Sequence, residues 1–325
     1  PRPEVMRHMV RAGNLGIIVP RRVETAGAWL HVLVTDRIIE HVVVSLKTID
    51  SLLPLYCYRD EDKHVGTIEN WPPGKDGRRP NLAPDFVADM ERRLKFQFTP
   101  DPGLVGQALL PAQDKKPKSG QTRVSAPPDQ KNIFTPEDVF HYIYAVLHSP
   151  TYRERYAQFL KIDFPRIPLT SSRPVFRNLC KLGAELTSLH LMETFGPDIT
   201  SYPVKGDNMV EKVRYQPPGS GTGVSPVDEP NHGRACPERS RRDGRATKRG
   251  RVWINKEQYV EGVPPEVWEF HVGGYQVCRK WLKDRRGRML SYDDIGHYEH
   301  IVAALNETIR LMAAIDKAIP KWPIE

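Results

Sequence analysis

The stretch VWEFHVGGYQVCRKWLKDRRGR, residues 267–288, joins an apolar run, a Gly-Gly turn and an aromatic, strongly basic helix. Two adjacent glycines reach backbone conformations that other residues avoid, so the turn can hold Tyr275 and Gln276 at the start of the helix. The basic side chains that follow are Arg279, Lys280, Lys283, Arg285, Arg286 and Arg288. This pattern is typical of a surface that binds a polyanion. A solvated cationic helix is the alternative, and composition alone does not separate the two.

Two further groups of motifs accompany this stretch. FTPEDVFHYIYAVLHSPTYRERY at 134–156 continues into DFPRIP at 163–168, and a shorter pair consists of NLGI at 14–17 and LPLYCY at 53–58. Together these segments resemble the C-terminal specificity (target-recognition) region of type ISP restriction-modification enzymes and related adenine-specific DNA methyltransferases. The resemblance covers most of the chain, except for two low-complexity segments described below.

The resemblance implies a DNA-modifying enzyme within a restriction-modification or phage-defence system. A fuller polypeptide would transfer a methyl group from S-adenosylmethionine to N6 of adenine, and this chain would recognise double-stranded DNA. Upstream methyltransferase domains, with helicase and nuclease parts in some members, would carry the chemistry. No cofactor is then expected in this chain. It starts with Pro1 rather than Met, and we expect a fragment or a processed piece of a longer protein.

The composition is typical of a globular protein, and its net charge favours an anionic partner. The 325 residues suffice for one large core or two modest ones, with 39% hydrophobic and 27% charged residues. A net charge of +8 favours nucleic acid or a membrane surface as partner. No apolar run is long enough to span a bilayer and no secretory signal is present, and we expect no membrane partner. Isolated cysteines fit reduced thiols, so we expect a cytoplasmic protein. The four cysteines are isolated in sequence, which argues against a zinc site or a disulfide scaffold.

Patterning predicts an α+β fold in four parts. We expect a strand-rich part over 1–99, a flexible connector over 100–130, a helical block over 131–200 and a C-terminal strand/helix specificity unit over 201–325. β-Branched and aromatic runs predict strands at 15–19, 31–35, 38–44 and 52–58. The polar segment 59–80 predicts a loop, and the four-residue spacing of Phe86, Met90 and Leu94 predicts a helix over 84–94.

Helix starts are clear in the second half of the chain. Thr135 followed by Pro136 and Asp138 predicts a capped helix, Ser149-Pro150 predicts a break, and Ser291 with Asp294 predicts the cap of a long closing helix. A third helix is expected over 175–189, and strands over 209–216 and 251–255. The intervening segment, about 217–250, is rich in Gly, Pro and Arg, and this composition predicts a disordered basic insertion. A DNA-clamping arm is the alternative.

Catalytic motifs are not apparent. An adenine amino-methyltransferase needs a Gly-rich loop after a buried strand and an Asn/Asp-Pro-Pro-Tyr/Phe turn that holds the flipped base. GSGTG at 219–223 follows two prolines and opens a low-complexity loop, while NWPPG at 70–74 has Gly where the stacking aromatic should stand. No zinc helix, Walker loop or nucleophile elbow occurs either. We therefore predict no catalytic residue and no metal ligand in this chain.

Candidate DNA contacts come from the basic stretch and two other places. They are Tyr275, Gln276, Lys280, Lys283, Arg285, Arg286, Arg288, Arg173, Arg177, Arg21 and Arg22. Cations on phosphates fix position, while Arg, Lys or Gln on base edges read sequence. The aromatic residues of the basic stretch are more typical of core packing than of base stacking. Two other functions remain open: a non-catalytic protein-interaction or scaffold module, and a stand-alone methyltransferase with unrecognised motifs.

Overall fold

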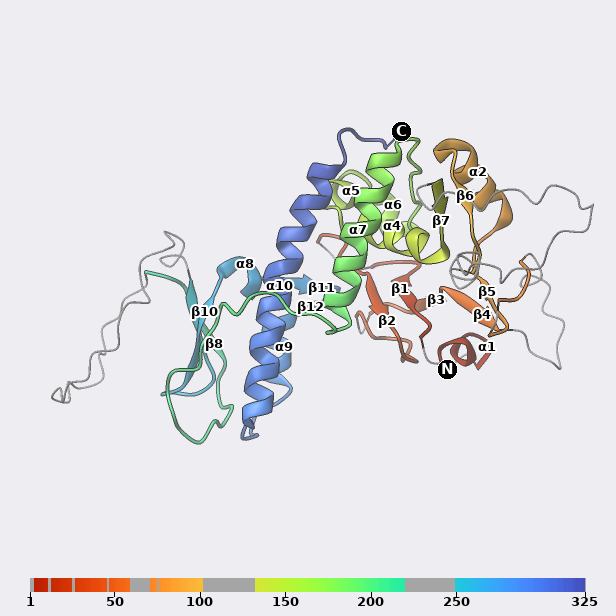
Figure 1. Cartoon of the computed structure of the whole chain (residues 1–325). Helices are drawn as coiled ribbons and strands as arrows, with labels where there is room; N and C mark the ends of the chain where they lie inside the picture. Colours follow the sequence, from red (N-terminus) through yellow and green to blue (C-terminus); the bar gives the residue numbers. More distant parts are fainter. Residues whose placement is uncertain are drawn as a thin grey trace, which may run out of the picture. The chain divides into compact units, whose positions relative to one another are not determined.

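The computed structural model describes residues 3–10, 13–24, 27–45, 47–58, 71–74, 76–101, 132–219 and 249–324. The chain forms two compact units (Figure 1). Unit 1 comprises Pro1–Thr194, Val272–Gly274 and Arg310–Glu325, and unit 2 comprises Phe195–His271 and Tyr275–Ile309. Helices combined with small, mostly antiparallel sheets confirm the α+β class. The four-part division expected from the sequence stays a prediction, and most of the connector and the basic insertion lies outside the described residues.

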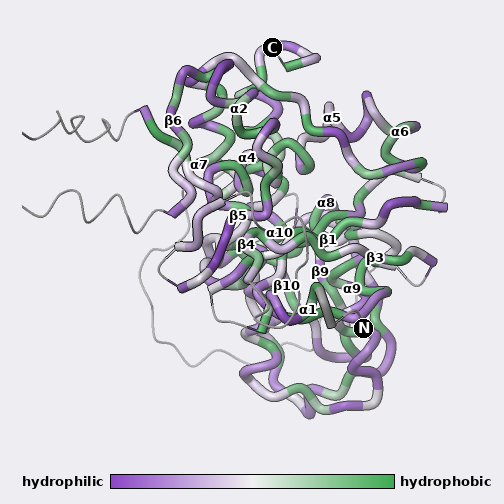
Figure 2. Tube along the Cα trace, turned by 90° about the vertical axis from the view of Figure 1, so that its right-hand side faces the viewer, coloured by the Kyte–Doolittle hydropathy of each residue, from purple (hydrophilic) through white to green (hydrophobic). Residues whose placement is uncertain are grey.

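A three-stranded antiparallel sheet, in the order β2-β1-β3, lies at the centre of unit 1. β1 (Gly16–Pro20) is buried along its whole length, between β2 (Leu33–Thr35) and β3 (Asp50–Pro54). Its β-branched residues fit a strand that is covered on both faces, and its trace is largely hydrophobic in Figure 2. Two smaller strand pairs accompany this sheet: β4 (Tyr56–Tyr58) antiparallel to β5 (Arg78–Pro80), and β6 (Gln97–Phe98) parallel to β7 (Ile133–Phe134).

The side chain of Asn14, in the NLGI motif, fastens the N-terminal turn to β4. Its amide nitrogen donates to the carbonyls of His8 (2.8 Å) and Tyr56 (2.9 Å), and its Oδ1 accepts the Tyr56 amide at 3.1 Å. Asn14 is buried, so each of these bonds compensates for the loss of water. The short helices held in this way are α1 (Pro3–Met6) and the 3-10 turn η1 (Arg7–Met9).

The predicted helix starts of unit 1 are confirmed. Thr135 Oγ1 accepts the Asp138 amide while the Asp138 carboxylate accepts the Thr135 amide, which is a complete capping box. Ser149 ends one helix and caps the next, as its hydroxyl accepts the Tyr152 amide. The helices are α2 (Pro84–Leu94), α4 (Pro136–His148), α5 (Pro150–Arg155), α6 (Ala157–Ile162) and α7 (Arg173–His190).

The close approach of α4 and α7 organises the helical part of unit 1. A Cβ atom added at Gly183 of α7 would lie 1.9 Å from the carbonyl oxygen of His141 in α4. Beside this contact the Phe176 ring packs against Phe134 (5.9 Å between centroids) and Tyr142 (5.4 Å). Glycine at position 183 is therefore required by packing rather than by backbone conformation.

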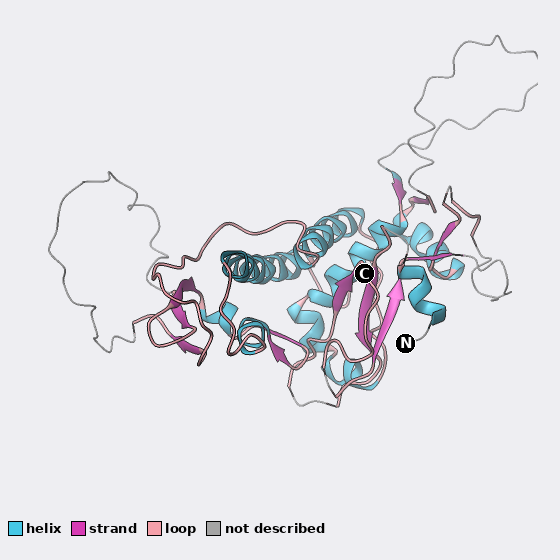
Figure 3. Cartoon of the chain, turned by 90° about the horizontal axis from the view of Figure 1, so that it is seen from below, coloured by secondary structure: helices cyan, strands magenta, loops and turns pink. Residues whose placement is uncertain are grey.

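Unit 2 is built on the antiparallel sheet β10-β9-β8. Its core contains apolar residues of the sheet and of the helices around it, among them Val252, Val260, Trp268, Leu282 and Tyr298. The Ser291–Asp294 capping box begins the longest helix of the described residues, of which the part up to Ile309 belongs to this unit. Figure 3 distinguishes the helices of the chain from its short strands by colour. The elements are β8 (Arg214–Gln216), β9 (Gly250–Trp253), β10 (Tyr259–Val263), α8 (Pro265–Trp268), β11 (His271–Val272), β12 (Tyr275–Gln276), α9 (Val277–Lys283) and α10 (Tyr292–Ala318). Val272 of β11 and the part of α10 after Ile309 belong to unit 1.

Several strand predictions are wrong. The run 38–44 forms no strand, and residues 41–44 form turns and bends. There the Asp50 carboxylate accepts the Val44 amide at 2.8 Å, and the Asp50 amide donates to His41 O at 2.9 Å, so these bonds take the place of strand pairing. The run 52–58 contains two strands of separate sheets. The segment 59–80 holds β5 rather than loop alone, 209–216 forms a strand only at its end, and β10 was not anticipated.

The α4–α7 contact generates a stability prediction. Gly183→Ala forces a methyl group against the His141 carbonyl, so we expect a loss of about 1–3 kcal/mol in the free energy of unfolding. The measurement is urea denaturation followed by circular dichroism. Gly296→Ala in α10 is the matched control, since no heavy atom lies within 4 Å of its added Cβ, and helix propensity favours it by up to about 1 kcal/mol. Equal stabilities of the two variants would contradict the packing argument.

Candidate functional site

A cationic cavity lies in unit 2. It has a volume of about 410 Å³ and is lined by Glu211, Lys212, Val213, Arg279, Lys283 and Arg286. Four of its six lining residues carry a positive charge and one carries a negative charge. A concave surface of this composition concentrates a positive potential that attracts anions.

Helix α9 and the turn after it supply one side of the cavity. Arg279 and Lys283 are one helical turn apart and exposed, while Cys278 and Leu282 on the other face are fully buried in the core of unit 2. Arg286 follows in the turn, where its amide donates to Lys283 O at 3.3 Å. The apolar periodicity of α9 therefore determines which of its basic residues face the cavity.

The segment 208–213 supplies the other side, and its backbone is fixed by neighbours on two sides. The Val210 amide donates to Arg288 O at 3.0 Å and the Gly287 amide donates to Val210 O at 2.8 Å. On the opposite side the Glu211 amide donates to Ile254 O at 2.9 Å. These bonds hold Glu211 and Lys212 next to the basic turn although they lie about 70 residues away in sequence.

A buried amide network supports this segment. Gln258 accepts the Asn208 amide hydrogen at Oε1 (2.8 Å), and its Nε2 donates to Asn208 Oδ1 (2.8 Å) and to Val204 O (3.2 Å). Asn208 has a positive φ of 57° and donates from Nδ2 to Leu290 O at 3.3 Å. Asn255 adds bonds to Met209 O (3.1 Å) and to Gln258 Oε1 (3.0 Å).

In the part of the chain that the structure describes, the basic residues that line the cavity lack the ion pairs that neighbouring basic residues form. Lys280 pairs with Asp284 and lies 5.3 Å from the centre of the Tyr275 ring. Arg285 stacks 3.6 Å from the centre of the Trp281 ring and lies 3.9 Å from Asp294. Among the described residues, by contrast, no ion pair involves Lys212, Arg279, Lys283 or Arg286. The cavity cations are therefore available to a bound anion.

Gln276 and Arg288, also predicted in the basic stretch, do not line the cavity. Gln276 donates from Nε2 to Trp268 O at 2.6 Å, which fixes the start of α9. Arg288 is exposed, and its carbonyl accepts the Val210 amide. The bend itself requires glycine, because Gly273 has a φ of 55° and an added Cβ would lie 2.1 Å from Val44 O.

The candidates outside this stretch are not part of the cavity. Arg173 donates to the carbonyls of Leu94 (2.7 Å) and Lys95 (3.0 Å) at the end of α2. Arg177 bonds to Ile133 O and lies 3.5 Å from the Asp138 carboxylate. Arg21 pairs with Asp163 at 2.9 Å, and Arg22 is exposed. As DNA contacts these residues remain predictions, but the structure gives Arg173 and Arg177 a role in packing. Glu211, Lys212 and Arg279 line the cavity but are not among the DNA contacts predicted from the sequence.

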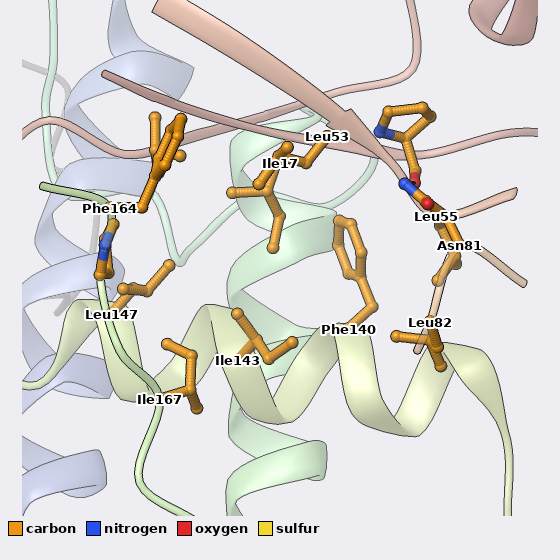
Figure 4. Close-up of a pocket in the computed structure, with 13 residues that line it drawn as sticks. Ile17, Leu53, Leu55, Asn81, Leu82, Phe140, Ile143, Leu147, Phe164 and Ile167 are labelled. Atoms are coloured by element: carbon orange, nitrogen blue, oxygen red, sulfur yellow. Dashed lines mark hydrogen bonds between the residues drawn. The ribbon is translucent and has the colours of Figure 1, made fainter. Parts of the chain in front are cut away.

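A second cavity, of about 260 Å³, lies in unit 1 between the central sheet and α4. Ile17 and Leu53 of the strands point toward Phe140 and Ile143 of α4, and the lining is apolar apart from Asn81 (Figure 4). Such a surface suits apolar side chains rather than a polyanion.

Buried and half-buried polar groups of unit 1 form a cluster of their own. Tyr144 Oη lies 2.6 Å from His190 Nδ1, the rings of His148 and His190 are 5.2 Å apart, and the buried Arg153 donates to Leu147 O at 2.6 Å. Burial, followed by the charge of Arg153, lowers the pKa of His190 to about 4. The same causes, with a contribution from Lys161, lower the pKa of His31 to about 4.

The buried cysteines are free thiols. Cys57, Cys180 and Cys278 have no disulfide partner, and burial raises the pKa of Cys57 to about 11 and of Cys278 to about 12. Within the described ranges no group of three or more His, Cys, Asp or Glu side chains could hold a metal ion. None of the helices in the same ranges has the length and hydrophobicity needed to cross a bilayer.

Fold and cavity together define an α+β domain suited to an anionic ligand. The family model of the type ISP C-terminal specificity domain matches residues 1–314, and the chain belongs to this family. The predicted resemblance is thereby confirmed. A comparison with curated protein sequences gave no match.

Three solved structures share the fold. A nuclease-deletion mutant of the type ISP restriction-modification enzyme LlaGI in complex with a DNA substrate mimic has 16% identity and a TM-score of 0.50, over 96% of this chain and 22% of that chain. The ATP-dependent type ISP enzyme LlaBIII bound to DNA has 16% identity and a TM-score of 0.54, over 96% and 16%. A DrdV-DNA complex has 17% identity and a TM-score of 0.50, over 99% and 26%. This chain thus spans 16–26% of the length of these proteins.

The buried histidines generate a pH prediction. Their pKa in the folded protein, about 4, lies below the ordinary value of 6.5, so the unfolded chain binds more protons between these pH values. The free energy of unfolding is therefore expected to fall as pH is lowered from about 6.5 to about 4. His190→Gln removes one of the titrating groups and should therefore reduce the decrease in the free energy of unfolding. Urea denaturation at a series of pH values measures this decrease. An unchanged pH dependence in the variant would argue against the buried neutral state of His190.

Proposed function

We propose that this chain binds double-stranded DNA and selects the target site for a restriction-modification enzyme. The observation that carries the proposal is the cationic cavity of a type ISP specificity domain, in which Lys212, Arg279, Lys283 and Arg286 have no internal ion pair among the described residues. Solved proteins of the same fold bind DNA, which supports the same partner here.

The geometry of the cavity suits contacts with the DNA backbone. A phosphate accepts charge-assisted hydrogen bonds from Arg and Lys, and each such contact releases condensed counterions from the duplex. Arg279 and Lys283 come from a helix packed on the core of unit 2, while Lys212 comes from a segment bonded on two sides. Cations held by rigid elements lose less conformational entropy on binding than cations on loose chain.

We infer further that the longer polypeptide is an adenine-specific methyltransferase that uses S-adenosylmethionine. The support is the family resemblance of the motifs at 134–156 and 267–288. In such an enzyme the target base leaves the duplex and enters a catalytic pocket. The present chain would hold the surrounding DNA during this step, and methyl transfer would take place in another part of the polypeptide.

Charge removal from the cavity tests DNA binding. The triple variant Arg279→Gln, Lys283→Gln and Arg286→Gln should bind duplex DNA more weakly, because each lost phosphate contact removes part of the counterion release. The slope of log affinity against log salt should become shallower by about 0.9 per lost contact. Fluorescence anisotropy with a labelled duplex at stepped salt concentrations measures both quantities.

A matched triple variant controls for net charge. Lys181, Lys205 and Lys256 are exposed and lie outside the cavity, so their replacement by Gln removes the same charge. The proposal requires this control to keep the wild-type salt slope. An equal loss in both triple variants would reduce the interaction to a nonspecific effect of net charge.

Cofactor binding tests where methyl transfer resides. If transfer takes place outside this chain, isothermal titration of the chain with S-adenosylmethionine should give no binding heat, with and without duplex DNA. Saturable binding by the chain alone would favour a stand-alone methyltransferase instead.

A further inference from the structure

The carboxylate of Glu211 stands out in the cationic cavity. A surface that only contacted phosphates would be weakened by a negative side chain, because like charges repel across the short distances of such contacts. Yet Glu211 lines the same cavity as Lys212, Arg279, Lys283 and Arg286.

Internal neutralisation does not account for this carboxylate. In the part of the chain that the structure describes, Glu211 forms no ion pair with any of the four cations, whereas the nearby carboxylates of Asp284 and Asp294 each have a basic partner. Glu211 is also exposed, so its carboxylate can reach a bound molecule.

The backbone at Glu211 is positioned more firmly than an exposed residue requires. Its amide donates to Ile254 O at 2.9 Å, and the preceding Val210 forms two bonds with the turn at 287–288. The buried side chain of Gln258 holds Asn208 just upstream through two bonds of 2.8 Å. Residues that read bases must be held in this way, because direct readout depends on accurate placement of the side chain.

The chemistry of a carboxylate restricts what it can read. An ionised glutamate only accepts hydrogen bonds, so it needs a base edge that donates one. In the major groove the donors are the exocyclic amino groups, and the characteristic pairing of Glu or Asp is with N4 of cytosine. Arg279 and Arg286 on the other side of the cavity carry the guanidinium group that matches O6 and N7 of guanine, the partner of cytosine.

We propose that Glu211 is a specificity-determining residue that accepts a hydrogen bond from the N4 amino group of a cytosine in the target site. This inference rests on the proposed DNA binding and adds the residue and the base that it selects. Thymine at the same position presents the O4 acceptor to the carboxylate, so the site discriminates by repulsion as well as by attraction.

Selection from a randomised duplex library tests this assignment. The wild-type chain is incubated with a library of random double-stranded DNA, bound duplexes are sequenced, and base preferences are derived at each position. Wild type should prefer cytosine at one position or more. Glu211→Gln should lower the preference for cytosine at a single position by roughly tenfold, with a gain of adenine, whose N6 and N7 suit an amide. Glu211→Ala should lose the preference there without gaining adenine.

Glu257→Gln is the matched control, since Glu257 is exposed in the same unit but does not line the cavity. It should leave all positions unchanged. Unchanged preferences in both Glu211 variants, or a gain in affinity that is uniform over all sequences, would overturn the assignment and leave Glu211 as a modulator of charge. Failure of the wild-type chain to bind any duplex would instead refute the proposed function, so the two failures are distinguishable.

Discussion

The reciprocal pairing of Gln258 with Asn208 is the constraint on which the cationic cavity depends. Gln258 is almost fully buried, and its amide is satisfied only if the chain at 204–208 follows one path. Gly206 is part of that path, because an added Cβ would lie 2.5 Å from Gln258 Cδ. A buried amide without partners is costly, so the network selects one conformation of the segment that carries Glu211 and Lys212. Without this network, the segment opposite the basic residues of α9 would have no single conformation.

Local signals explain why much of the fold could be predicted. The capping boxes at Thr135 and Ser291 each involve two residues three positions apart, so they can be recognised without tertiary information. The strand predicted over 38–44 is absent because its fate depends on a contact outside the run. The Asp50 carboxylate takes the place of a strand partner, and its position could not be known from residues 38–44 alone. β-Propensity describes a side chain that fits a sheet and not whether a neighbouring strand is present.

The candidate site was predictable only in part. The basic helix was recognisable, and Lys283 and Arg286 do line the cavity. That Lys280 is paired could have been anticipated from Asp284 one turn later, and Arg285 has Trp281 one turn earlier. Lys212 and Glu211 had no such signal, because hydrogen bonds between segments far apart in sequence bring them to the cavity. The packing roles of Arg173 and Arg177 were hidden for the same reason.

The buried thiols provide a way to follow the two units separately. Cys57 and Cys180 belong to unit 1 and Cys278 to unit 2, and all three are shielded in the folded chain. Only the thiolate reacts with alkylating reagents, so labelling of these cysteines requires local or global opening. Cys236 lies outside the described residues and can be replaced by serine. The rates at which the remaining thiols are alkylated, resolved by peptide mass spectrometry, then report how often each unit opens and whether DNA protects one unit more than the other.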